Sequence, residues 1–192
     1  MPALSDKTEL RKRMRAQRLR LARSLPDAAA RAAAALPEDL LPRFSVVGGY
    51  HAMGTELDPA PVMRRFAAAG ARLALPVAKD ATSPLTFRLW VEGQAQVPDA
   101  FGIPAPGPGA ADALPDLVIA PLLAFDRRGH RLGQGAGHYD RSIASLRAAK
   151  PVFVLGLGYA GQEVEELPDE PHDERLDAIL TETGYIPVDK EI

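Results

Sequence analysis

The chain of 192 residues contains no cysteine, a single tryptophan and no long apolar run. The absence of cysteine excludes disulfide bonds, thiolate-bound zinc and a cysteine nucleophile. A transmembrane helix needs about 18 consecutive apolar residues, and because no run approaches this length we expect no membrane partner. The N-terminus is charged and lacks the apolar segment of a signal peptide. These absences together predict a cytoplasmic protein.

Charge is balanced over the whole chain but unevenly distributed. The net charge is −2, which does not favour nucleic acid or an acidic membrane as a partner. Residues 7–23, however, contain eight Lys or Arg residues and only one acidic residue, Glu9. This basic segment could be a solvated helix face, a set of cations that reach an anionic ligand, or a nucleic-acid arm. The third interpretation is disfavoured because the segment has no aromatic residue for base stacking.

Residues 126–141 are the most distinctive stretch, with four glycines and several interleaved arginines. A buried-type strand is predicted before it at 117–121, and a helix after it at 139–150. Glycine allows positive φ and lets backbone N–H groups approach a ligand closely, and a helix N-terminus favours an anion. The arrangement therefore indicates phosphate binding, although it matches neither the Walker A loop nor the dinucleotide fingerprint. From spacing alone, an ordinary glycine-rich loop with solvated arginines is about as probable.

Asp140 stands at the start of the predicted helix, beside the possible phosphate site. Mg²⁺ is typically held by one or two carboxylates together with substrate phosphates, so Asp140 is a candidate metal ligand. The alternative is that Asp140 only interacts favourably with the helix dipole.

Alternating helices and short apolar strands predict a single α/β domain that spans residues 1–192. Predicted helices cover 5–23, 26–36, 59–69, 139–150 and 174–180, with Ser5 as the first N-cap and Asp177 on the last helix. Predicted strands cover 45–50, 72–76, 85–91, 117–121, 151–158 and 185–188, and residues 92–116 are predicted to be a loop. The unit 45–76 has βαβ order, so its two strands should be parallel. Ligands bind at the carboxyl ends of such strands, which places His51 and Glu56 on the functional edge.

Five motifs together resemble the 5-formyltetrahydrofolate cyclo-ligase family, and they cover almost the whole chain. They are Lys7-Thr-Glu-Leu-Arg11, Glu56-Leu-Asp58, Phe101-Gly-Ile-Pro-Ala-Pro106, the stretch from Pro121 through Gly129 to Arg141, and Gln162 with Leu167-Pro168 and His172-Asp-Glu-Arg-Leu-Asp177. The resemblance implies a three-layer αβα sandwich with a mostly parallel sheet, similar to ribose-5-phosphate isomerases and CoA transferases.

The resemblance also implies an enzyme that closes a ring in 5-formyltetrahydrofolate to give 5,10-methenyltetrahydrofolate, with ATP as co-substrate, Mg²⁺ as cofactor, and ADP and phosphate as products. The formyl oxygen is a poor leaving group, and phosphorylation of that oxygen lets the folate N10 attack. Such chemistry depends on positioning and charge stabilisation, so the lack of cysteine is no obstacle.

The same resemblance assigns site residues. Catalysis is assigned to Arg131, Gly135 and Tyr139. ATP binding is assigned to Lys7, Arg11, Arg131, Leu132, Gly133, Gln134, Gly135, Ala136, Gly137, His138 and Tyr139. Folate binding is assigned to His51, Glu56, Phe101, Gln134, Gly135, Ala136, Gly137 and His138. The metal is assigned to Asp140 and Asp177.

The loop departs from the family pattern at three positions. Many relatives carry Arg or Lys where Gln134 and Ala136 stand, and an aromatic residue where His138 stands. Either Arg131, Arg128 or Lys7 compensates for the missing loop cations, or turnover is slow.

Two other functions remain open from the sequence. One is a sugar-phosphate isomerase or CoA-transferase-like enzyme of the same fold class, and the other is a non-catalytic nucleic-acid-binding module that uses the basic N-terminal helix. The favoured partners are small molecules only, with no nucleic acid, and the chain is expected to be a monomer or a weak homodimer.

Overall fold

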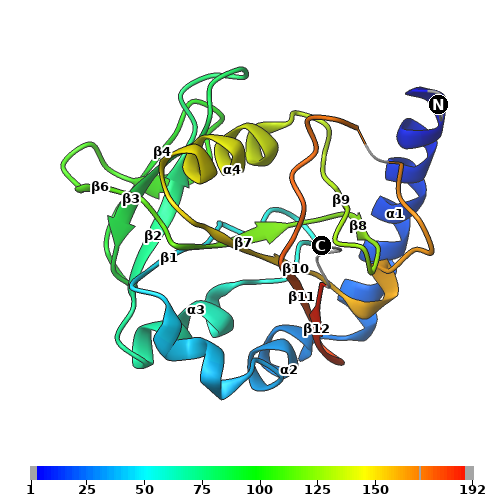
Figure 1. Ribbon diagram of the computed structural model, residues 1–192, viewed down its shortest axis with the longest axis horizontal. Coiled ribbons are helices and arrows are strands. Elements are labelled where there is room, and N and C mark those ends of the chain that lie inside the picture. The colour runs from blue at the N-terminus through cyan, green and yellow to red at the C-terminus, as the bar shows by residue number, and fades with distance from the viewer. Residues whose placement is uncertain (1–3, 169, 189–192) are drawn as a thin grey trace.

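An eight-stranded sheet with the strand order β12-β11-β10-β7-β1-β2-β3-β6 forms the centre of the computed structural model, which describes residues 4–168 and 170–188 (Figure 1). The strands from β11 to β2 run parallel, as predicted for β1 and β2, while β12, β3 and β6 pair antiparallel with their neighbours. In chain order they are β1 (Val46–Gly48), β2 (Arg72–Val77), β3 (Thr86–Trp90), β6 (Asp112–Ala113), β7 (Leu117–Pro121), β10 (Phe153–Leu157), β11 (Ala178–Thr181) and β12 (Gly184–Pro187).

The central strand β7 explains why the sheet is covered on both faces. Its residues 117–120 are all buried, and successive side chains in a strand point to opposite faces. Leu117 and Ile119 therefore pack into one core cluster, whereas Val118 and Ala120 pack into another. A continuous apolar run of this kind is typical of parallel sheets between two helical layers.

The helices form those two layers. The first cluster packs against α2 (Ala28–Ala34) and α3 (Ala60–Ala68), and the second against α4 (His138–Ala149), which lies on the other face of the sheet (Figure 1). The predicted three-layer αβα sandwich with a mostly parallel sheet is therefore confirmed.

The long basic helix α1 (Leu4–Ser24) lies at one side of the sandwich (Figure 1). Its buried Met14 packs with Leu123, Leu132 and Leu167 in a third cluster, separate from the other two. This contact holds α1 beside the short hairpin of β8 (Ala124–Phe125) and β9 (Arg131–Leu132). No helix among the described residues is long and apolar enough to cross a membrane.

Several predicted elements are corrected by the structure. The predicted helix at 174–180 is wrong, because residues 178–181 form β11, and a short apolar run cannot be distinguished from a helix by periodicity alone. The predicted loop 92–116 contains the hairpin of β4 (Gln96–Pro98) and β5 (Pro104–Pro106) as well as β6. Ser5 lies inside α1 rather than before it. Two 3₁₀ segments, η1 (Glu38–Arg43) and η2 (Ala160–Gln162), complete the fold.

Candidate active site

A cavity of about 670 Å³ lies at the carboxyl ends of β1, β2 and β7. Its lining contains every residue assigned from the sequence except Asp177, namely Lys7, Arg11, His51, Glu56, Phe101 and all ten residues from Arg131 to Asp140. Because these residues come from α1, β9, three loops and the start of α4, the fold brings distant parts of the chain to one edge of the sheet, as expected for a parallel α/β fold.

The glycine loop, residues 133–137, joins β9 to α4 at one end of this cavity. Gly135 has φ 109° and Gly137 has φ 66°, so both adopt the left-handed region that favours glycine. No acceptor among the described residues receives a hydrogen bond from the backbone N–H groups of this loop. The loop therefore carries several backbone donors that remain available to a ligand.

Two arginines of α1 hold the carbonyl side of the same loop. Arg11 Nε donates to the carbonyl oxygen of Gly133 at 3.1 Å. Arg15 donates to the Gln134 side-chain oxygen through Nε and Nη2, both at 3.1 Å, and to its carbonyl oxygen at 3.5 Å. These contacts fix the first two carbonyl groups of the loop relative to α1. The loop has no cation of its own, and α1 supplies cations beside it.

Arg131 and Tyr139 lie at the base of the loop. Arg131 Nη2 donates to Asp140 Oδ1 at 2.5 Å, and the Arg131 side chain is only 3% exposed. Its Nε is buried without a partner among the described residues, and its guanidinium carbon lies 5.8 Å from the Tyr139 ring centre. Burial raises the pKa of the Tyr139 hydroxyl far above its usual value, with a further contribution from Glu56. Tyr139 is therefore a hydrogen-bond donor rather than a base near neutral pH.

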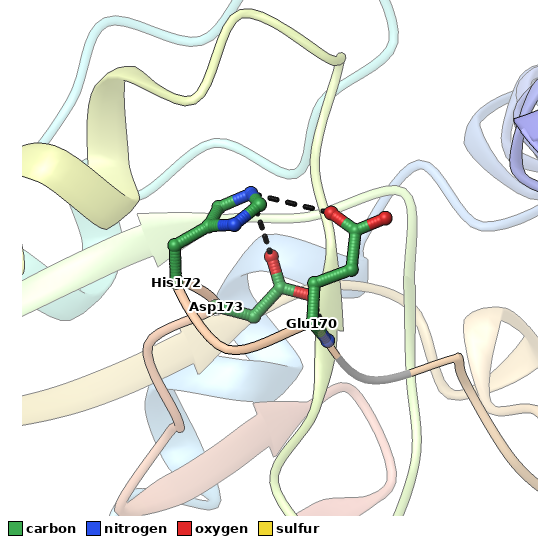
Figure 2. Close-up of side chains that lie close together, drawn as sticks. All are labelled: Glu170, His172 and Asp173. Carbon is green, nitrogen blue, oxygen red and sulfur yellow. Dashed lines mark hydrogen bonds and ion pairs between the residues drawn. The ribbon is translucent and has the colours of Figure 1, made fainter. Parts of the chain in front are cut away.

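Asp140 connects the loop to an acidic cluster formed by Glu170, His172 and Asp173. Asp140 Oδ1 also accepts a hydrogen bond from the Glu174 backbone N–H at 3.2 Å. In the cluster, one ligand atom from each of the three side chains lies within 4.8 Å of the others, and His172 Nε2 is 3.2 Å from Glu170 Oε2 (Figure 2).

Lys7 completes this cluster as its cation. Its Nζ lies 3.0 Å from Glu170 and 3.3 Å from Asp173, and the Lys7 side chain is 12% exposed. The contact lowers the pKa of Glu170, first through the hydrogen bond from Lys7 and then through its charge. This corner of the cavity is therefore built to hold a cation against carboxylates.

The structure places Asp177 elsewhere. Its Oδ2 accepts hydrogen bonds from the Val154 backbone N–H at 2.7 Å and from Arg147 Nη2 at 2.9 Å, and the side chain is 8% exposed. Asp177 does not line the cavity, so the two aspartates assigned to the metal are not brought together there. The contacts of Asp177 link β10, α4 and the segment before β11.

At the other end of the cavity, Glu56 is held in place by the loop after β1. One oxygen of Glu56 accepts a hydrogen bond from the Met53 backbone N–H at 2.9 Å, and the other lies 3.6 Å from Arg18 Nη1. Burial lowers the pKa of Arg18, while the charge of Glu56 opposes this effect. A carboxylate fixed in this way is suited to accept hydrogen bonds from a polar ligand.

Phe101 and His138 form the aromatic part of this end. Their ring centres are 5.4 Å apart, and Phe101 is 51% exposed. His138 Nε2 also lies 3.1 Å from the carbonyl oxygen of Ala81, which accepts a hydrogen bond from Arg141 as well. His51 lines the same end and is exposed. This geometry gives a flat ligand an aromatic surface next to a fixed carboxylate.

Comparison with known proteins identifies the family. The family model of the 5-formyltetrahydrofolate cyclo-ligase family matches residues 3–182. The chain belongs to this family. It is 31% identical over 171 residues to the 5-formyltetrahydrofolate cyclo-ligase of Mycolicibacterium smegmatis, covering 83% of this chain and 87% of the relative. It is 36% identical to that of Escherichia coli K12, covering 66% and 71%.

A solved structure gives the same result for the fold. The NMR structure of the 5,10-methenyltetrahydrofolate synthetase of Aquifex aeolicus matches with a TM-score of 0.76 at 26% identity, covering 97% of this chain and 94% of that one. The similarity to cyclo-ligases therefore extends over nearly the whole length of both chains.

Sequence reasoning missed two carboxylates of the cavity lining and the contact of Arg15 with the glycine loop, and it overestimated Arg128. Glu170 and Asp173 were not assigned, although Asp173 falls in a quoted motif, because sequence spacing does not reveal that Lys7 lies beside them. Arg15 was one of many cations on α1, and only the contact with Gln134 singles it out. Arg128, expected to compensate for missing loop cations, pairs with Asp126 and Glu166 and does not line the cavity.

Proposed function

We propose that the chain catalyses the ATP-dependent cyclisation of 5-formyltetrahydrofolate to 5,10-methenyltetrahydrofolate, with release of ADP and phosphate. The observation that carries the proposal is the glycine loop, which has unused backbone donors and lines the cavity together with Lys7, Arg11 and Arg131. Backbone N–H groups and cations at the start of a helix are the groups that bind phosphate best.

The terminal phosphates of ATP would lie between the glycine loop and α1. Arg11 is within reach of them, since its guanidinium lies about 3.5 Å from where a side chain on Gly135 would begin. Arg131, which forms an ion pair with Asp140 at the base of the loop, would add positive charge beside the phosphates. The absence of loop cations at Gln134 and Ala136 is then offset by α1 and β9.

Mg²⁺ would be held by the carboxylates of Glu170 and Asp173, with Asp140 on the adjoining segment as the further ligand. Hard oxygen ligands next to a phosphate site fit Mg²⁺, and the Glu174 backbone N–H bound to Asp140 keeps the two segments adjacent. When bound, Mg²⁺ would neutralise charge on the phosphate oxygens. Lys7 occupies the same carboxylates, so it would move toward the phosphates when the metal takes its place. Asp177 would serve as a structural carboxylate.

The reduced folate would bind at the other end, between Glu56, His51, Phe101 and His138. The terminal phosphoryl group then passes to the formyl oxygen, and N10 attacks the formyl carbon, which releases phosphate with that oxygen and a proton from N10. Arg131 and the protonated Tyr139 lie between the two ends and would stabilise charge on the transferred group. Positioning of this kind needs no covalent nucleophile.

The test is the absorbance of the methenyl product after 5-formyltetrahydrofolate is added with and without ATP, with ADP measured in parallel. We expect product and ADP in equal amounts, and only when ATP and Mg²⁺ are present. If no ADP is released after 5-formyltetrahydrofolate is added, the result would instead favour an isomerase or transferase of the same fold class. Folate and ATP as small-molecule partners are consistent with the family. Four expectations stay predictions: the cytoplasmic location, the single-domain boundary, the oligomeric state and the lack of nucleic-acid binding.

A further inference from the structure

Arg18 of α1 is a buried cation for which the reaction described above has no use. The residue is only 6% exposed, and it does not line the cavity, whereas the neighbouring Glu56 does. Arginine is rarely buried unless it is paired, because the loss of water around a charged group is costly. Arg18 therefore lies behind the cavity wall, and its role depends on the groups that it contacts there.

Arg18 contacts two consecutive residues of the loop after β1. Its Nε donates to Thr55 Oγ1 at 3.1 Å, and its Nη1 lies 3.6 Å from Glu56 Oε1. The second distance is longer than a hydrogen bond, and this Nη1 is buried without a hydrogen-bond partner among the described residues. Arg18 is thus fixed by Thr55 and places its charge beside Glu56 without donating a hydrogen bond to it.

The Glu56 carboxylate is also held from its other side. Its Oε2 accepts a hydrogen bond from the Met53 backbone N–H at 2.9 Å, and the Glu56 backbone N–H donates to the Met53 carbonyl oxygen at 3.2 Å. Gly54, with φ 61°, allows the tight turn between these two residues. Oε1, in contrast, accepts no hydrogen bond from the described residues and faces Arg18. The carboxylate therefore keeps one oxygen for a ligand.

The position of Arg18 is determined by the packing of α1. Arg11, Arg15 and Arg18 have the spacing i, i+4, i+7 and share one face of this helix. The first two contact the glycine loop, and the third contacts the loop after β1. One turn beyond Arg18, Leu21 packs closely on η2, where a Cβ on Gly161 would lie 2.9 Å from Leu21 Cδ2. One face of a firmly packed helix thus places cations beside both ends of the cavity.

We propose that Arg18 is a positioning residue for folate binding, and that it acts on the folate only through the Glu56 carboxylate. The proposal rests on the proposed function, in which Glu56 contacts the reduced folate. A buried ion pair generally adds little net stability, since desolvation offsets the attraction between the two charges. A contribution to stability alone is therefore a weak reason for a buried arginine at this place. The orientation of a carboxylate in the cavity wall is a better one.

Two variants of Arg18 test this role in the full reaction. Arg18→Gln keeps a hydrogen-bond donor and removes the charge, and we expect KM for 5-formyltetrahydrofolate to rise ~10-fold while KM for ATP and kcat stay within about twofold. Arg18→Lys keeps the charge and should bring KM for folate back to within about threefold of wild type. Arg65→Gln is the matched control, because it removes a partly buried arginine that pairs with Glu38 and does not line the cavity. It should leave both KM values unchanged.

The route through Glu56 is tested in a double variant. In the Glu56→Gln background, Arg18→Gln should raise KM for folate by less than about twofold, because the contact can be lost only once. A further rise of ~10-fold there would show that Arg18 acts by another route and would overturn the proposal. If Arg18→Gln does not fold, Thr55→Val takes its place, since it removes only the hydroxyl that holds Nε. We expect it to raise KM for folate ~3-fold, and an unchanged KM would contradict the proposal.

Amide hydrogen exchange separates this proposal from the proposed function, because it needs no substrate. Arg18→Gln should speed the exchange of the Met53 N–H, since the Glu56 carboxylate that accepts its hydrogen bond is held less firmly, whereas Arg65→Gln should not. If wild-type protein forms no methenyl product, the proposed function fails. Faster exchange at Met53 would then still assign Arg18 to the orientation of Glu56, and unchanged exchange would refute this role as well.

In an active wild-type protein, the kinetic result decides. If Arg18→Gln keeps the wild-type KM for folate, or if Arg18→Lys does not lower the raised KM, the charge of Arg18 has no part in folate binding and the proposal is wrong.

Discussion

The two halves of the stretch 126–141 have similar compositions and opposite roles. Both contain glycines with positive φ, and both carry or contact arginines. In residues 126–130, the polar groups form hydrogen bonds with one another and with Leu167 of a nearby segment. The backbone donors of residues 133–137, in contrast, have no hydrogen-bond partner among the described residues. The first half is thus a structural turn, and the second is the candidate phosphate site.

Asp126 is the centre of the structural half. It is fully buried, and its carboxylate accepts hydrogen bonds from the backbone N–H groups of Arg128, His130 and Leu167 and lies 3.0 Å from His130 Nδ1. Burial alone would raise the pKa of Asp126, but the hydrogen bonds from Leu167 and His130 outweigh it and lower the pKa. The carboxylate of Asp126 therefore stays ionised, and its hydrogen bonds keep the turn closed.

The glycines differ in the same way. A Cβ on Gly129 would lie 2.8 Å from the carbonyl oxygen of Leu176, so close packing excludes any side chain there. At Gly135 the nearest atoms would be those of the Arg11 guanidinium, 3.5 Å away. The comparison teaches that glycine content alone does not identify a phosphate site, and that the unused backbone donors make the second half the better candidate.

The largest expected effect is the loss of stability when Asp126 is removed. Asp126→Ala leaves several buried N–H groups without an acceptor, and we expect the free energy of unfolding to fall by about 3–5 kcal/mol. Denaturant unfolding measures this, with kcat determined on the folded fraction. A variant of wild-type stability with a lost kcat would assign this half to catalysis.

The same carboxylate gives a pH dependence with a definite sign. Because its folded-state pKa is lowered, the stabilisation by ionised Asp126 is present above the unfolded value of about 3.9 and is lost as the pH falls through the folded-state pKa. The difference in unfolding free energy between wild type and Asp126→Asn should therefore shrink as the pH is lowered below about 4.

The next effect separates two aspartates. Asp140→Asn removes a cavity carboxylate, and we expect kcat to fall by about 100-fold with little loss of stability, because a ligand of the Mg²⁺ that would neutralise the phosphoryl oxygens is lost. Asp177→Asn is the matched control, and it should lower the unfolding temperature while kcat stays within about twofold. The reverse pattern would restore Asp177 as the metal ligand.

A smaller effect is expected inside the loop. Gly135→Ala forces a side chain onto φ 109° and changes the direction of the neighbouring N–H groups, so we expect KM for ATP to rise about tenfold. Gly133→Ala is the control, because Gly133 has no positive φ and a Cβ there meets only Arg131 Nη1, at 3.6 Å. Equal KM values in the two variants would argue against the loop as the phosphate site.

The layers and the site edge could be predicted from the sequence, because apolar runs such as Leu117–Pro121 and the βαβ order determine them locally. What could not be predicted depends on contacts between distant segments. Asp140 pairs with Arg131 in the cavity, whereas Asp177 pairs with Arg147 outside it, and the sequence does not reveal these partners. The role of Gln162 likewise depends on its buried amide, which donates to the carbonyl groups of Leu122 and Leu123. The helix predicted at 174–180 failed because pairing with β10 overrides local preference.

The smallest effect concerns the clamp between α1 and the loop. Arg15 is exposed and contacts the loop only through Gln134, so we expect Arg15→Ala to raise KM for ATP about threefold with little change in KM for folate. If Arg15 acts through Gln134, the double variant with Gln134→Ala will show less than the sum of the two single effects, because the contact can be lost only once. Arg20→Ala, on the same helix but bound to Gln17, controls for the general charge of α1. The clamp would be contradicted if the effects of Arg15→Ala and Gln134→Ala on KM for ATP were fully additive, or if Arg20→Ala raised this KM equally. In either case α1 would contribute only its general positive charge, and the glycines alone would determine the orientation of the loop.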